Sequence, residues 1–346
     1  MPAPKEKPYV IPIFIPHSGC PHRCTFCNQH AVTGSQEKRP GPESLRAAVE
    51  HWLQYRSRAR GFTEISFYGG NFLGLEKDTI RRLLDEAACW VSSGKVHGIR
   101  FSTRPDTVDS ETLSLIARYP VSTVELGVQS MDDRVLTLLK RGHTSADSAA
   151  AANMIKKAKY RLGCQIMTGL PGEDPEGAIA TAAAAAALKP DFVRIYPLVV
   201  LSGSVLAAQY RAGRFEPLSL EQCVRRTAAL YKVFERNGIP VIRMGLQSSK
   251  ELDDRDTILA GPYHPALGHM VFSFLMLQRA FRLLDEAPQL PETVEMRVNP
   301  SSVSRMRGLK NNNIRTLEST YPHVRNFLVR PDPGVAQEEV VIAGCG

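Results

Sequence analysis

Three cysteines stand close together near the N-terminus of this 346-residue chain, in the stretch HSGCPHRCTFCNQH. Cys20, Cys24 and Cys27 form a CxxxCxxC array, and three histidines lie around them. Cysteines at such short spacing either bind metal or form disulfides. The chain has seven cysteines, an odd count, and the other four are scattered singly. This usage argues against a secreted disulfide framework, so we expect a metal centre and a reducing, cytoplasmic location.

Two kinds of metal centre fit the array. A structural zinc site has four tetrahedral ligands, normally two close pairs separated by a dozen or more residues, and no second pair follows here. A histidine would have to complete it, and the candidates are His17, His22 and His30. A 4Fe–4S cluster has four irons to ligate, so three cysteines on one loop leave the fourth iron open to a chelating molecule. We predict the cluster and keep zinc as the alternative.

Three of the scattered cysteines allow a prediction. Cys89 shares a helical stretch with Leu83 and Leu84, which predicts a buried small hydrophobe. Cys164 lies in an apolar strand stretch, where a place in the core is favoured over one lining the barrel. Cys345, in the terminal AGCG, is expected to lie in a disordered tail rather than to reach the site.

Composition indicates a soluble globular protein. Hydrophobic residues make up 43% of the chain, and the mean hydropathy is −0.19. No apolar run approaches the roughly 18 to 20 residues of a membrane helix. The proline-broken N-terminus reads as a leader and first strand rather than a signal peptide. The net charge of +8 favours acidic partners, with nucleic acid as the first candidate.

Strand and helix signals alternate through the first two-thirds of the chain. Apolar or β-branched runs predict six strands, at 9–15, 64–68, 98–102, 121–128, 162–167 and 191–197. Helices are predicted between them, at 43–57, 76–93, 109–118, 131–160 (as two helices) and 175–188. This alternation predicts parallel βαβ units in an α/β fold, a partial (β/α)6 TIM-like barrel. A helix-rich stretch at 204–237, a further strand at 239–246 and an apolar helix near 267–285 are expected to follow.

Polar motifs recur where the predicted strands end. They read YGGN (68–71), STRPD (102–106), VELGVQS (124–130), KRGHT (140–144) and IMTGLPGED (166–174). The carboxyl ends of parallel strands meet at one edge of a barrel, and barrel enzymes build their sites there. We therefore expect these motifs to converge beside the cysteine array, which itself follows the first strand.

The array, with Phe26 directly before its third cysteine, resembles the radical S-adenosylmethionine (SAM) superfamily. With the downstream motifs, residues 9–250 are most similar to the Elongator catalytic subunit and to oxygen-independent coproporphyrinogen oxidases. The resemblance implies an enzyme with a 4Fe–4S cluster whose open iron is chelated by SAM. One electron then cleaves SAM to methionine and a 5′-deoxyadenosyl radical, which requires a low-potential electron donor of flavodoxin or ferredoxin type. The chain is expected to be a bacterial-type relative without the acetyltransferase domain.

The resemblance also implies roles for single residues. Gln129 is expected to bind the SAM ribose, Gln165 to make a further polar ribose contact and Arg141 to bind the carboxylate. The backbone of 167–170 is expected to flank adenine, and the YGGN glycines to meet the amino group. Asn71 and Ser102 depart from the glutamates that many relatives carry. The expected SAM-binding set is Phe26, Gly69, Gly70, Asn71, Ser102, Arg104, Glu125, Gln129, Arg141, Gln165 and Met167. Two alternatives stay open: a salt bridge at the barrel rim for Arg104, and a structural, barrel-lining carboxylate for Glu125.

The chain is expected to divide into a barrel with its C-terminal extension (1–250) and a unit made of a loop, a helix and a small basic α+β fold (251–346). Residues 293–342 read as strand, helix, loop, helix, strand and strand, which is the plan of an RNA-binding KH domain with a GLKN loop (308–311) between its helices. Seven lysines and arginines face two glutamates between 295 and 330, a net charge of +5. The expected RNA-phosphate contacts are Arg305, Arg307, Lys310 and Arg315. The alternative is a solvated unit that only closes the barrel.

Three functions follow from these patterns. The first is radical SAM chemistry on RNA, specifically modification of a tRNA base. The second is the same chemistry on a small molecule such as a tetrapyrrole. The third is a zinc-stabilised RNA-binding protein without catalysis. In the two catalytic cases, Tyr263 and His264, in the turn-rich stretch GPYHPALGH, are candidates for a lid over the substrate.

Overall fold

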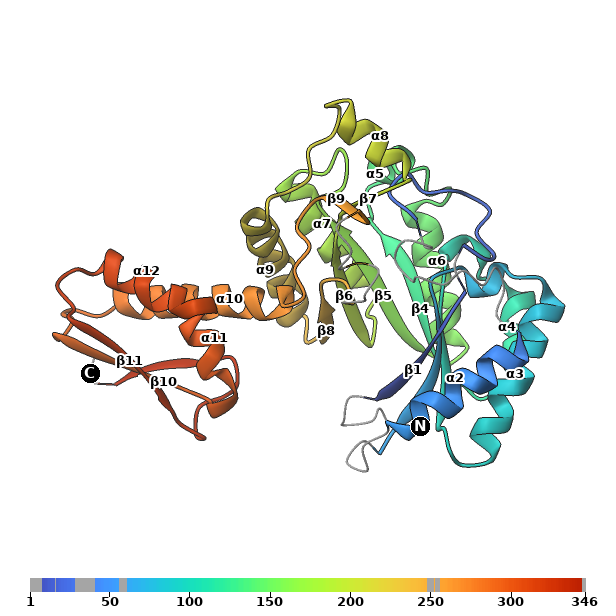
Figure 1. Ribbon diagram of the computed structural model, residues 1–346, viewed down its shortest axis with the longest axis horizontal. Helices are drawn as coiled ribbons and strands as arrows, with labels where there is room; N and C mark the ends of the chain where they lie inside the picture. The colour runs from blue at the N-terminus through green and yellow to red at the C-terminus, as the bar shows by residue number, and fades with distance from the viewer. Residues whose placement is uncertain are drawn as a thin grey trace.

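The computed structural model describes residues 8–15, 17–28, 41–55, 61–247, 252 and 256–343. Seven strands form one parallel sheet in the order β1-β2-β3-β4-β5-β6-β8. They are β1 (Tyr9–Phe14), β2 (Thr63–Tyr68), β3 (Gly98–Thr103), β4 (Val121–Gln129), β5 (Arg161–Thr168), β6 (Phe192–Pro197) and β8 (Val241–Met244). The sheet curls into an open half-barrel (Figure 1). The predicted strands and the partial barrel are therefore confirmed.

Helices connect the strands and cover the outer face of the sheet. They are α2 (Pro42–Gln54), α3 (Lys77–Ser92), α4 (Ser110–Ile116), α5 (Asp133–Leu138), α6 (Ser145–Lys157), α7 (Pro175–Ala187) and α9 (Leu220–Arg236). Two 3-10 turns, η1 (Phe72–Gly74) and η2 (Pro105–Thr107), follow β2 and β3. The two helices predicted within 131–160 are α5 and α6. Side-chain caps at Asp109, Thr144 and Ser219 fix where α4, α6 and α9 begin.

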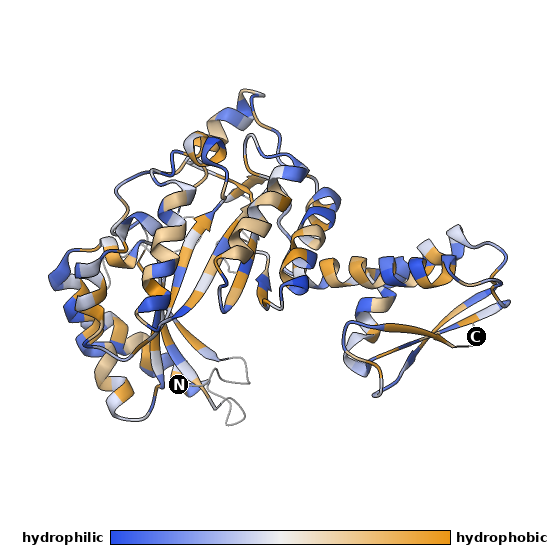
Figure 2. Ribbon diagram, turned by 180° about the vertical axis from the view of Figure 1, so that it is seen from behind, coloured by the Kyte–Doolittle hydropathy of each residue, from blue (hydrophilic) through white to orange (hydrophobic). Residues whose placement is uncertain are grey.

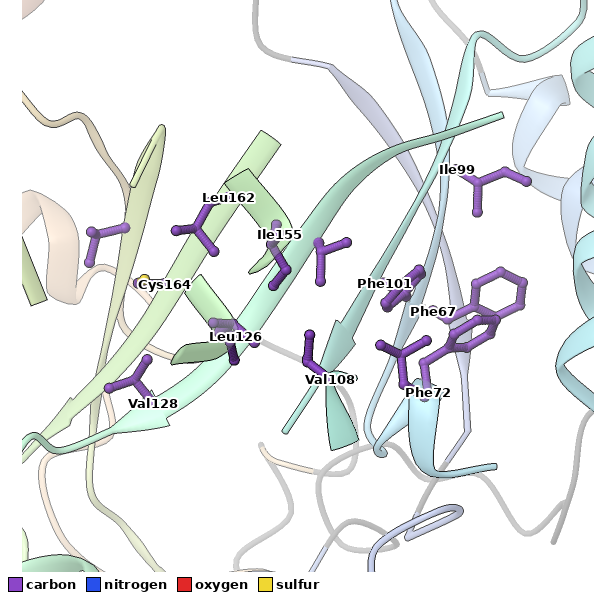
Figure 3. Close-up of a cluster of buried hydrophobic side chains, with 14 of the residues drawn as sticks. Phe67, Phe72, Ile99, Phe101, Val108, Leu126, Val128, Ile155, Leu162 and Cys164 are labelled. Carbon is purple, nitrogen blue, oxygen red and sulfur yellow. The ribbon is translucent and has the colours of Figure 1, made fainter. Parts of the chain in front are cut away.

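Strand residues alternate between two environments, as the banded strands in Figure 2 show. One set packs against the helices in the main core, with Phe67, Phe101, Leu126 and Leu162 among its members (Figure 3). Cys164 belongs to this core and is fully buried, which confirms the predicted core position. The other set faces the concave side of the half-barrel and is largely polar.

The prediction that Cys89 is buried is wrong. The buried face of α3 is formed by Ile80, Leu83, Leu84 and Ala87, whereas Cys89 is exposed. Two residues beyond Ala87 correspond to a rotation of about 200° around a helix, which turns Cys89 away from the core. The prediction of a buried position relied on neighbourhood in sequence and ignored the helical phase.

A second unit lies beyond the barrel, at the far end of α10 (Leu267–Asp285), as Figure 1 shows. Its elements are β10 (Thr293–Val298), η3 (Pro300–Ser302), α11 (Val303–Arg307), η4 (Leu309–Asn311), α12 (Asn312–Thr320), β11 (Asn326–Pro331) and β12 (Val340–Ala343). The predicted order of strand, helix, helix, strand and strand is confirmed. The sheet order is β11-β10-β12, with β11 parallel and β12 antiparallel to β10.

Polar contacts tie this unit to the barrel. The Tyr231 hydroxyl on α9 donates to the Glu338 carboxylate at 2.7 Å. Arg279 on α10 pairs with Glu235 of α9 at 3.0 Å and with Glu338 at 3.8 Å. These contacts fix the C-terminal unit against the outer helices of the barrel. None of the described helices is long and apolar enough to cross a membrane.

Candidate active site at the carboxyl ends of the strands

The cysteine loop (17–28) follows β1 and is held by hydrogen bonds to segments far along the chain. The Thr25 amide donates to the Leu139 carbonyl at 3.0 Å, and the Leu206 amide donates to the Thr25 carbonyl at 2.8 Å. The Asn28 side chain donates to the Ser202 carbonyl at 2.7 Å. These partners lie around α5, β7 (Val200–Leu201) and α8 (Val205–Arg211), so the loop is fixed over the carboxyl ends of the central strands.

The three thiols differ in exposure. Cys24 is buried, whereas Cys20 and Cys27 are half-buried. Burial raises the pKa of the Cys20 thiol, and Arg104 and Arg141 oppose this effect without cancelling it. Metal binding requires the thiolate, so these guanidinium groups favour the form that a metal would take up.

The YGGN glycines allow β1, β2 and the cysteine loop to meet. A Cβ atom on Gly70 would lie 2.2 Å from the Ile15 carbonyl oxygen and 2.8 Å from that of Ser18. Gly69 adopts a φ of +83°, which side-chain-bearing residues rarely adopt. The structure therefore brings Gly69 and Gly70 to the cysteine loop, as the sequence predicts.

The structure gives Asn71 a different role from the SAM contact predicted from the sequence. Its side chain is fully buried, and its Oδ1 accepts hydrogen bonds from the Thr103 hydroxyl at 2.8 Å, the Thr107 hydroxyl at 2.9 Å and the Arg104 amide at 3.0 Å. Its Nδ2 donates to the Gly19 carbonyl at 2.7 Å. With no exposed surface, Asn71 cannot make the predicted ligand contact. It instead ties the end of β3 to the cysteine loop.

A group that we call the rim network surrounds Cys24. It consists of Cys24, Arg104, Asp106, Arg141 and His143. Arg141 donates from Nη1 to the Cys24 sulfur at 3.2 Å and from Nη2 to the Gly127 carbonyl at 2.7 Å. Arg104 pairs with both carboxylate oxygens of Asp106 at 2.9 Å and also donates to the Arg141 carbonyl. The rim salt bridge considered for Arg104 is therefore present.

His143 is a member of this network that the sequence analysis missed. It is buried, and the Val128 backbone lies close to its ring, but neither ring nitrogen makes a well-aligned hydrogen bond within the described parts of the chain. Burial, together with the nearby positive charges of Arg141 and Arg104, lowers its pKa to about 4, so the imidazole is neutral at neutral pH. The available signal was the motif KRGHT, where His143 stands two residues after Arg141.

A bulge at the end of β4 orients Gln129 toward the rim network. The pairing of β4 with β5 shifts register between Gly127 and Gln129, and Gln129 adopts a φ of +65°. A Cβ atom on Gly127 would lie 2.9 Å from Nη2 of Arg141 and 3.0 Å from Nε2 of Gln129. The two predicted ligand contacts, Gln129 and Arg141, are thus neighbours across the Gly127 backbone.

A second group of charges, the interior network, lies on the concave face below the rim. It consists of Glu64, Tyr68, Arg100, Glu125 and Arg194. Glu125 is fully buried and accepts hydrogen bonds from Arg194 Nη2 at 3.3 Å and from the Tyr68 hydroxyl at 3.2 Å, and it forms an ion pair with Arg194 Nε at 2.8 Å. Arg100 lies 3.4 Å from Glu64 and 3.5 Å from Glu125.

The interior network corrects the ligand role expected for Glu125. Burial by itself would raise the pKa of its carboxyl, but Arg194 and Arg100 outweigh burial and lower the pKa. Glu125 is therefore a charged, paired and buried side chain, which favours the structural alternative over the ligand role. Gln165 donates to Glu125 at 2.9 Å and to the Ser102 hydroxyl at 3.0 Å. Ser102 and Gln165 thus form the boundary between the interior and the site.

Apolar residues and one carboxylate complete the edge beyond β5. Phe26 and Met167 pack in one cluster with Leu139 and Leu170. The Glu173 carboxylate accepts from the Gly169 amide at 2.7 Å, and burial raises its pKa to about 7. Glu173 therefore shapes the 167–170 backbone, a role that the quoted motif contained but the sequence analysis did not assign.

The histidines around the array do not complete a metal site in the structure. Across the described ranges, no three His, Cys, Asp or Glu side chains are placed to hold a single ion. The His22 side chain is exposed, and its ring lies against the Gly142 backbone. His30 and Cys345 lie outside the described residues. Neither His17 and His22 with the thiols nor the three thiols alone form such a group in the described ranges.

The residues considered for a lid lie beside a small sheet of β7 and β9 (Ile258–Ala260). Tyr263 packs against an apolar cluster that includes Val199 and Leu201. The ring nitrogen Nδ1 of His264 accepts from the Ala266 amide at 3.0 Å, just before α10 begins. Both side chains support the loop locally, and their predicted contact with substrate stays a prediction.

This combination of half-barrel, cysteine loop and strand-end motifs agrees with the match to known families. The sequence model of the radical SAM superfamily matches residues 14–185, and that of the radical SAM C-terminal domain matches residues 190–276. The chain therefore belongs to the radical SAM superfamily and is a radical SAM enzyme. Members of this superfamily typically use a 4Fe–4S cluster and SAM.

Two individual proteins are similar to this chain in sequence. It is 30% identical over 234 residues to the uncharacterized protein MJ0486 of Methanocaldococcus jannaschii, covering 64% of this chain and 70% of that protein. It is 27% identical over 231 residues to the tRNA uridine(34) acetyltransferase of Dehalococcoides mccartyi, covering 57% of this chain but 50% of that enzyme. The chain thus spans half the length of this acetyltransferase.

The fold is also found in a solved structure. Elp3 of the archaeon Methanocaldococcus infernus, with an N-terminal deletion, superimposes with a TM-score of 0.61 at 20% identity. The match covers 78% of this chain and 63% of Elp3. This similarity supports the radical SAM half-barrel fold described above.

Proposed function

We propose that the chain holds a 4Fe–4S cluster on Cys20, Cys24 and Cys27, binds SAM beside it and modifies a base of tRNA. The observation that carries the proposal is the rim network, where two buried guanidiniums face one carboxylate and the thiol of Cys24. A buried excess of positive charge needs an anionic partner. Thiolates and the carboxylate of SAM are anions of the kind this edge would accept.

The residues present fit both groups. Three thiols on one anchored loop suit a cluster, and the buried Nε of Arg141 has no hydrogen-bond partner within the described chain. Arg141 would hold the SAM carboxylate, Gln129 and Gln165 the ribose, and the 167–170 backbone the adenine. When bound, the cluster supplies the electron that cleaves SAM to methionine and a 5′-deoxyadenosyl radical. The apolar packing around Met167 would keep water from the reacting atoms.

The RNA part of the proposal rests on how the C-terminal cations are distributed. On the sheet side, each arginine has a glutamate: Arg297 and Arg330 lie near Glu295, and Arg325 lies near Glu292. On the helix side, the predicted contacts have no carboxylate within 4 Å among the described residues. These are Arg305, Arg307, Lys310 and Arg315. Cations without acidic partners are available to phosphates.

The loop between α11 and α12 presents these cations together. Lys310 and Asn311 adopt φ values of +51° and +59°, and both are exposed. Arg305 stacks on the Phe272 ring of α10 at 4.4 Å, which fixes one cation beside the loop. Two of the similar proteins are tRNA uridine(34) acetyltransferases, and the part of those enzymes that this chain matches supports a tRNA substrate.

The cluster is tested by anaerobic reconstitution with iron and sulfide. We expect wild-type protein to bind iron, turn brown and release 5′-deoxyadenosine when dithionite and SAM are added. Cys24→Ala should lose both properties. Cys89→Ala is the matched control, because Cys89 is exposed on α3 and should leave both unchanged. A wild-type protein that binds no iron and cleaves no SAM would contradict the proposal.

The RNA substrate is tested separately, by binding of total tRNA and by mass spectrometry of its nucleosides after turnover. Arg307→Glu with Lys310→Glu should weaken tRNA binding by about tenfold or more and reduce its salt dependence. Arg325→Glu with Arg330→Glu changes the net charge equally on the sheet side and serves as the control. Equal effects of the two pairs would point to a small-molecule substrate instead.

A further inference from the structure

We propose that three planar side chains beside the loop at 308–311 stack an unpaired base of the RNA substrate. We call them the stacking platform, and they are His269 and Phe272 of α10 and Arg305 of α11. The inference rests on the proposed function and deepens it. It adds a contact to a base to the phosphate contacts, and so it requires an unpaired stretch in the substrate RNA.

Arg305 is stacked on an aromatic ring that is itself fixed. The guanidinium carbon of Arg305 lies 4.4 Å from the centre of the Phe272 ring, and Arg305 is half-buried. The ring of Tyr231 meets that of Phe272 edge-on, with 5.3 Å between their centres. A guanidinium on an aromatic ring keeps a second planar face, and nucleobases stack on such faces in RNA complexes. Arg305 is therefore held in an orientation that suits a base.

His269 extends the platform by one turn of α10. Residues three apart in sequence lie on the same face of a helix, so His269 and Phe272 are neighbours. Burial and the positive charge of Arg305 lower the pKa of the His269 imidazole, which is therefore neutral at neutral pH. A neutral imidazole is a further aromatic ring on which a base can stack.

One buried side chain fixes the platform relative to the cationic loop at 308–311. Asn313, at the start of α12, donates from Nδ2 to the Ser273 carbonyl of α10 at 2.9 Å and to the Met306 carbonyl of α11 at 3.1 Å. Both acceptors directly follow a platform residue in sequence. Gly308 packs so closely that a Cβ atom on it would lie 3.0 Å from the Asn313 side chain. The platform and the loop therefore form one surface.

Charge distinguishes the platform from a second stack on the same helix. Arg225 lies over the Phe274 ring at 5.3 Å, but it also pairs with Glu221 at 2.8 Å. Arg305 has no carboxylate within 4 Å among the described residues, and the exposed cations of the neighbouring loop have none either. Cations that follow a backbone, beside planar groups that stack bases, are typical of surfaces that bind single-stranded nucleic acid.

The platform lies close to the half-barrel. A Cβ atom on Gly268 would lie 3.4 Å from the Met244 carbonyl oxygen, so the first turn of α10 packs against the end of β8. Phe272 is four residues further along the helix, a rise of about 6 Å. An RNA strand held on the platform would therefore lie beside the half-barrel to which the proposed function assigns base modification.

The test measures the binding of two labelled RNA probes to cluster-free protein by fluorescence anisotropy at several salt concentrations. One probe is a short single strand, and the other has the same length and charge but carries no bases. Arg305→Lys keeps the charge and removes the planar face. We expect this variant to bind the single strand about tenfold more weakly, with an unchanged salt dependence. On the strand without bases, it should bind like wild type.

Two further variants make the test specific. Phe272→Leu removes the ring that supports Arg305 and should also weaken binding of the single strand. Arg225→Lys makes the same chemical change as Arg305→Lys in the second stack, and so it is the matched control. It should bind both probes like wild type.

Equal binding of the single strand by wild type and Arg305→Lys would overturn the platform, and so would equal wild-type affinity for the two probes. Absence of wild-type binding to either probe would overturn the platform and the RNA substrate together. The radical chemistry of the proposed function is read separately, as release of 5′-deoxyadenosine by reconstituted protein. Absence of that release would overturn the chemistry, and the two affinities would still decide the platform.

Discussion

The interior network and the rim network are both buried and both built around arginine, yet only the interior network balances its charges. Glu64 and Glu125 offset Arg100 and Arg194, and Tyr68 fills a remaining hydrogen bond. In the rim network, Arg104 and Arg141 face a single carboxylate, Asp106. The rim also contains a neutral imidazole and the Nε of Arg141, which make no aligned hydrogen bond within the described chain. The Nε atoms of Arg100 and Arg194 in the interior network make none either, but each lies within 3.5 Å of a carboxylate oxygen.

This difference in charge balance distinguishes residues that stabilise the fold from residues that are available to a ligand. Buried charges that neutralise one another stabilise a shape, and removing one partner leaves the other uncompensated. Buried donors without a partner carry a cost in the isolated protein, and that cost is recovered when a ligand supplies the missing acceptor. We therefore expect the interior network to stabilise the barrel and, under the proposed function, the rim network to bind anions.

The largest expected effect comes from breaking the balanced network. Glu125→Gln removes one of two carboxylates facing Arg100 and Arg194, and should lower the free energy of unfolding by about 3 to 5 kcal/mol. Chemical denaturation with urea measures this change. Glu111→Gln, which breaks the exposed pair with Lys77, is the control and should cost less than about 1 kcal/mol. A similar small loss for Glu125→Gln would show that the interior network is not structural.

A pH-dependent effect of about 3 kcal/mol is expected from His143 in the rim network. Its pKa is about 4 in the folded protein and 6.5 in the reference state, so the unfolded chain binds the proton first as the pH falls. Its contribution is present above pH 6.5 and is lost between pH 6.5 and 4. His143→Gln should remove this loss, which is measured as the difference between the unfolding curves of variant and wild type. Parallel curves across that range would contradict the buried neutral imidazole.

A smaller effect is expected at Asn71, which connects the end of β3 to the cysteine loop. Asn71→Ala leaves the hydroxyls of Thr103 and Thr107 and the amide of Arg104 without their shared acceptor, which should cost about 2 kcal/mol. The cysteine loop should become accessible to hydrogen exchange at the amide of Thr25 and its neighbours. Unchanged exchange there would show that Asn71 does not hold the loop.

Arg141→Leu should have the smallest effect on folding and a distinct effect on binding. We expect less than about 1.5 kcal/mol in unfolding, because no carboxylate within 4 Å in the described chain loses a partner. SAM binding by reconstituted protein should weaken by about 10- to 100-fold, since a charge-assisted bond is lost. Equilibrium dialysis with labelled SAM measures this change. Unchanged affinity would reassign the carboxylate contact.

The sequence was sufficient to predict the strands and helices. It was insufficient to predict which polar side chains already have partners inside the protein. Alternation of apolar residues predicted the seven strands, because one face of every strand packs against a helix. It did not predict that Asn71 and Glu125, at motif positions, are already surrounded by partners within the protein. That outcome depends on β3 and β6, which bring Thr103 and Arg194 to them from far along the chain.

His143 and Cys89 also show that burial is difficult to predict from the sequence: His143 is buried and Cys89 is exposed, and neither was predicted. His143 stands in a motif that the sequence analysis quoted, but its burial arises only when η2, β4 and the KRGHT loop pack together. Cys89 was placed beside buried leucines in sequence, and only the phase of α3 shows that it points outward. Local pattern predicts which residues share an element and only partly which residues share an environment.

The anchoring of the cysteine loop has a consequence for the life of the protein. Backbone bonds of Thr25 and side-chain bonds of Asn71 and Asn28 tie the loop to the rest of the half-barrel. Under the proposed function, these bonds would remain when oxygen removes the cluster. We therefore expect iron, sulfide and reductant to restore the cluster without refolding of the chain.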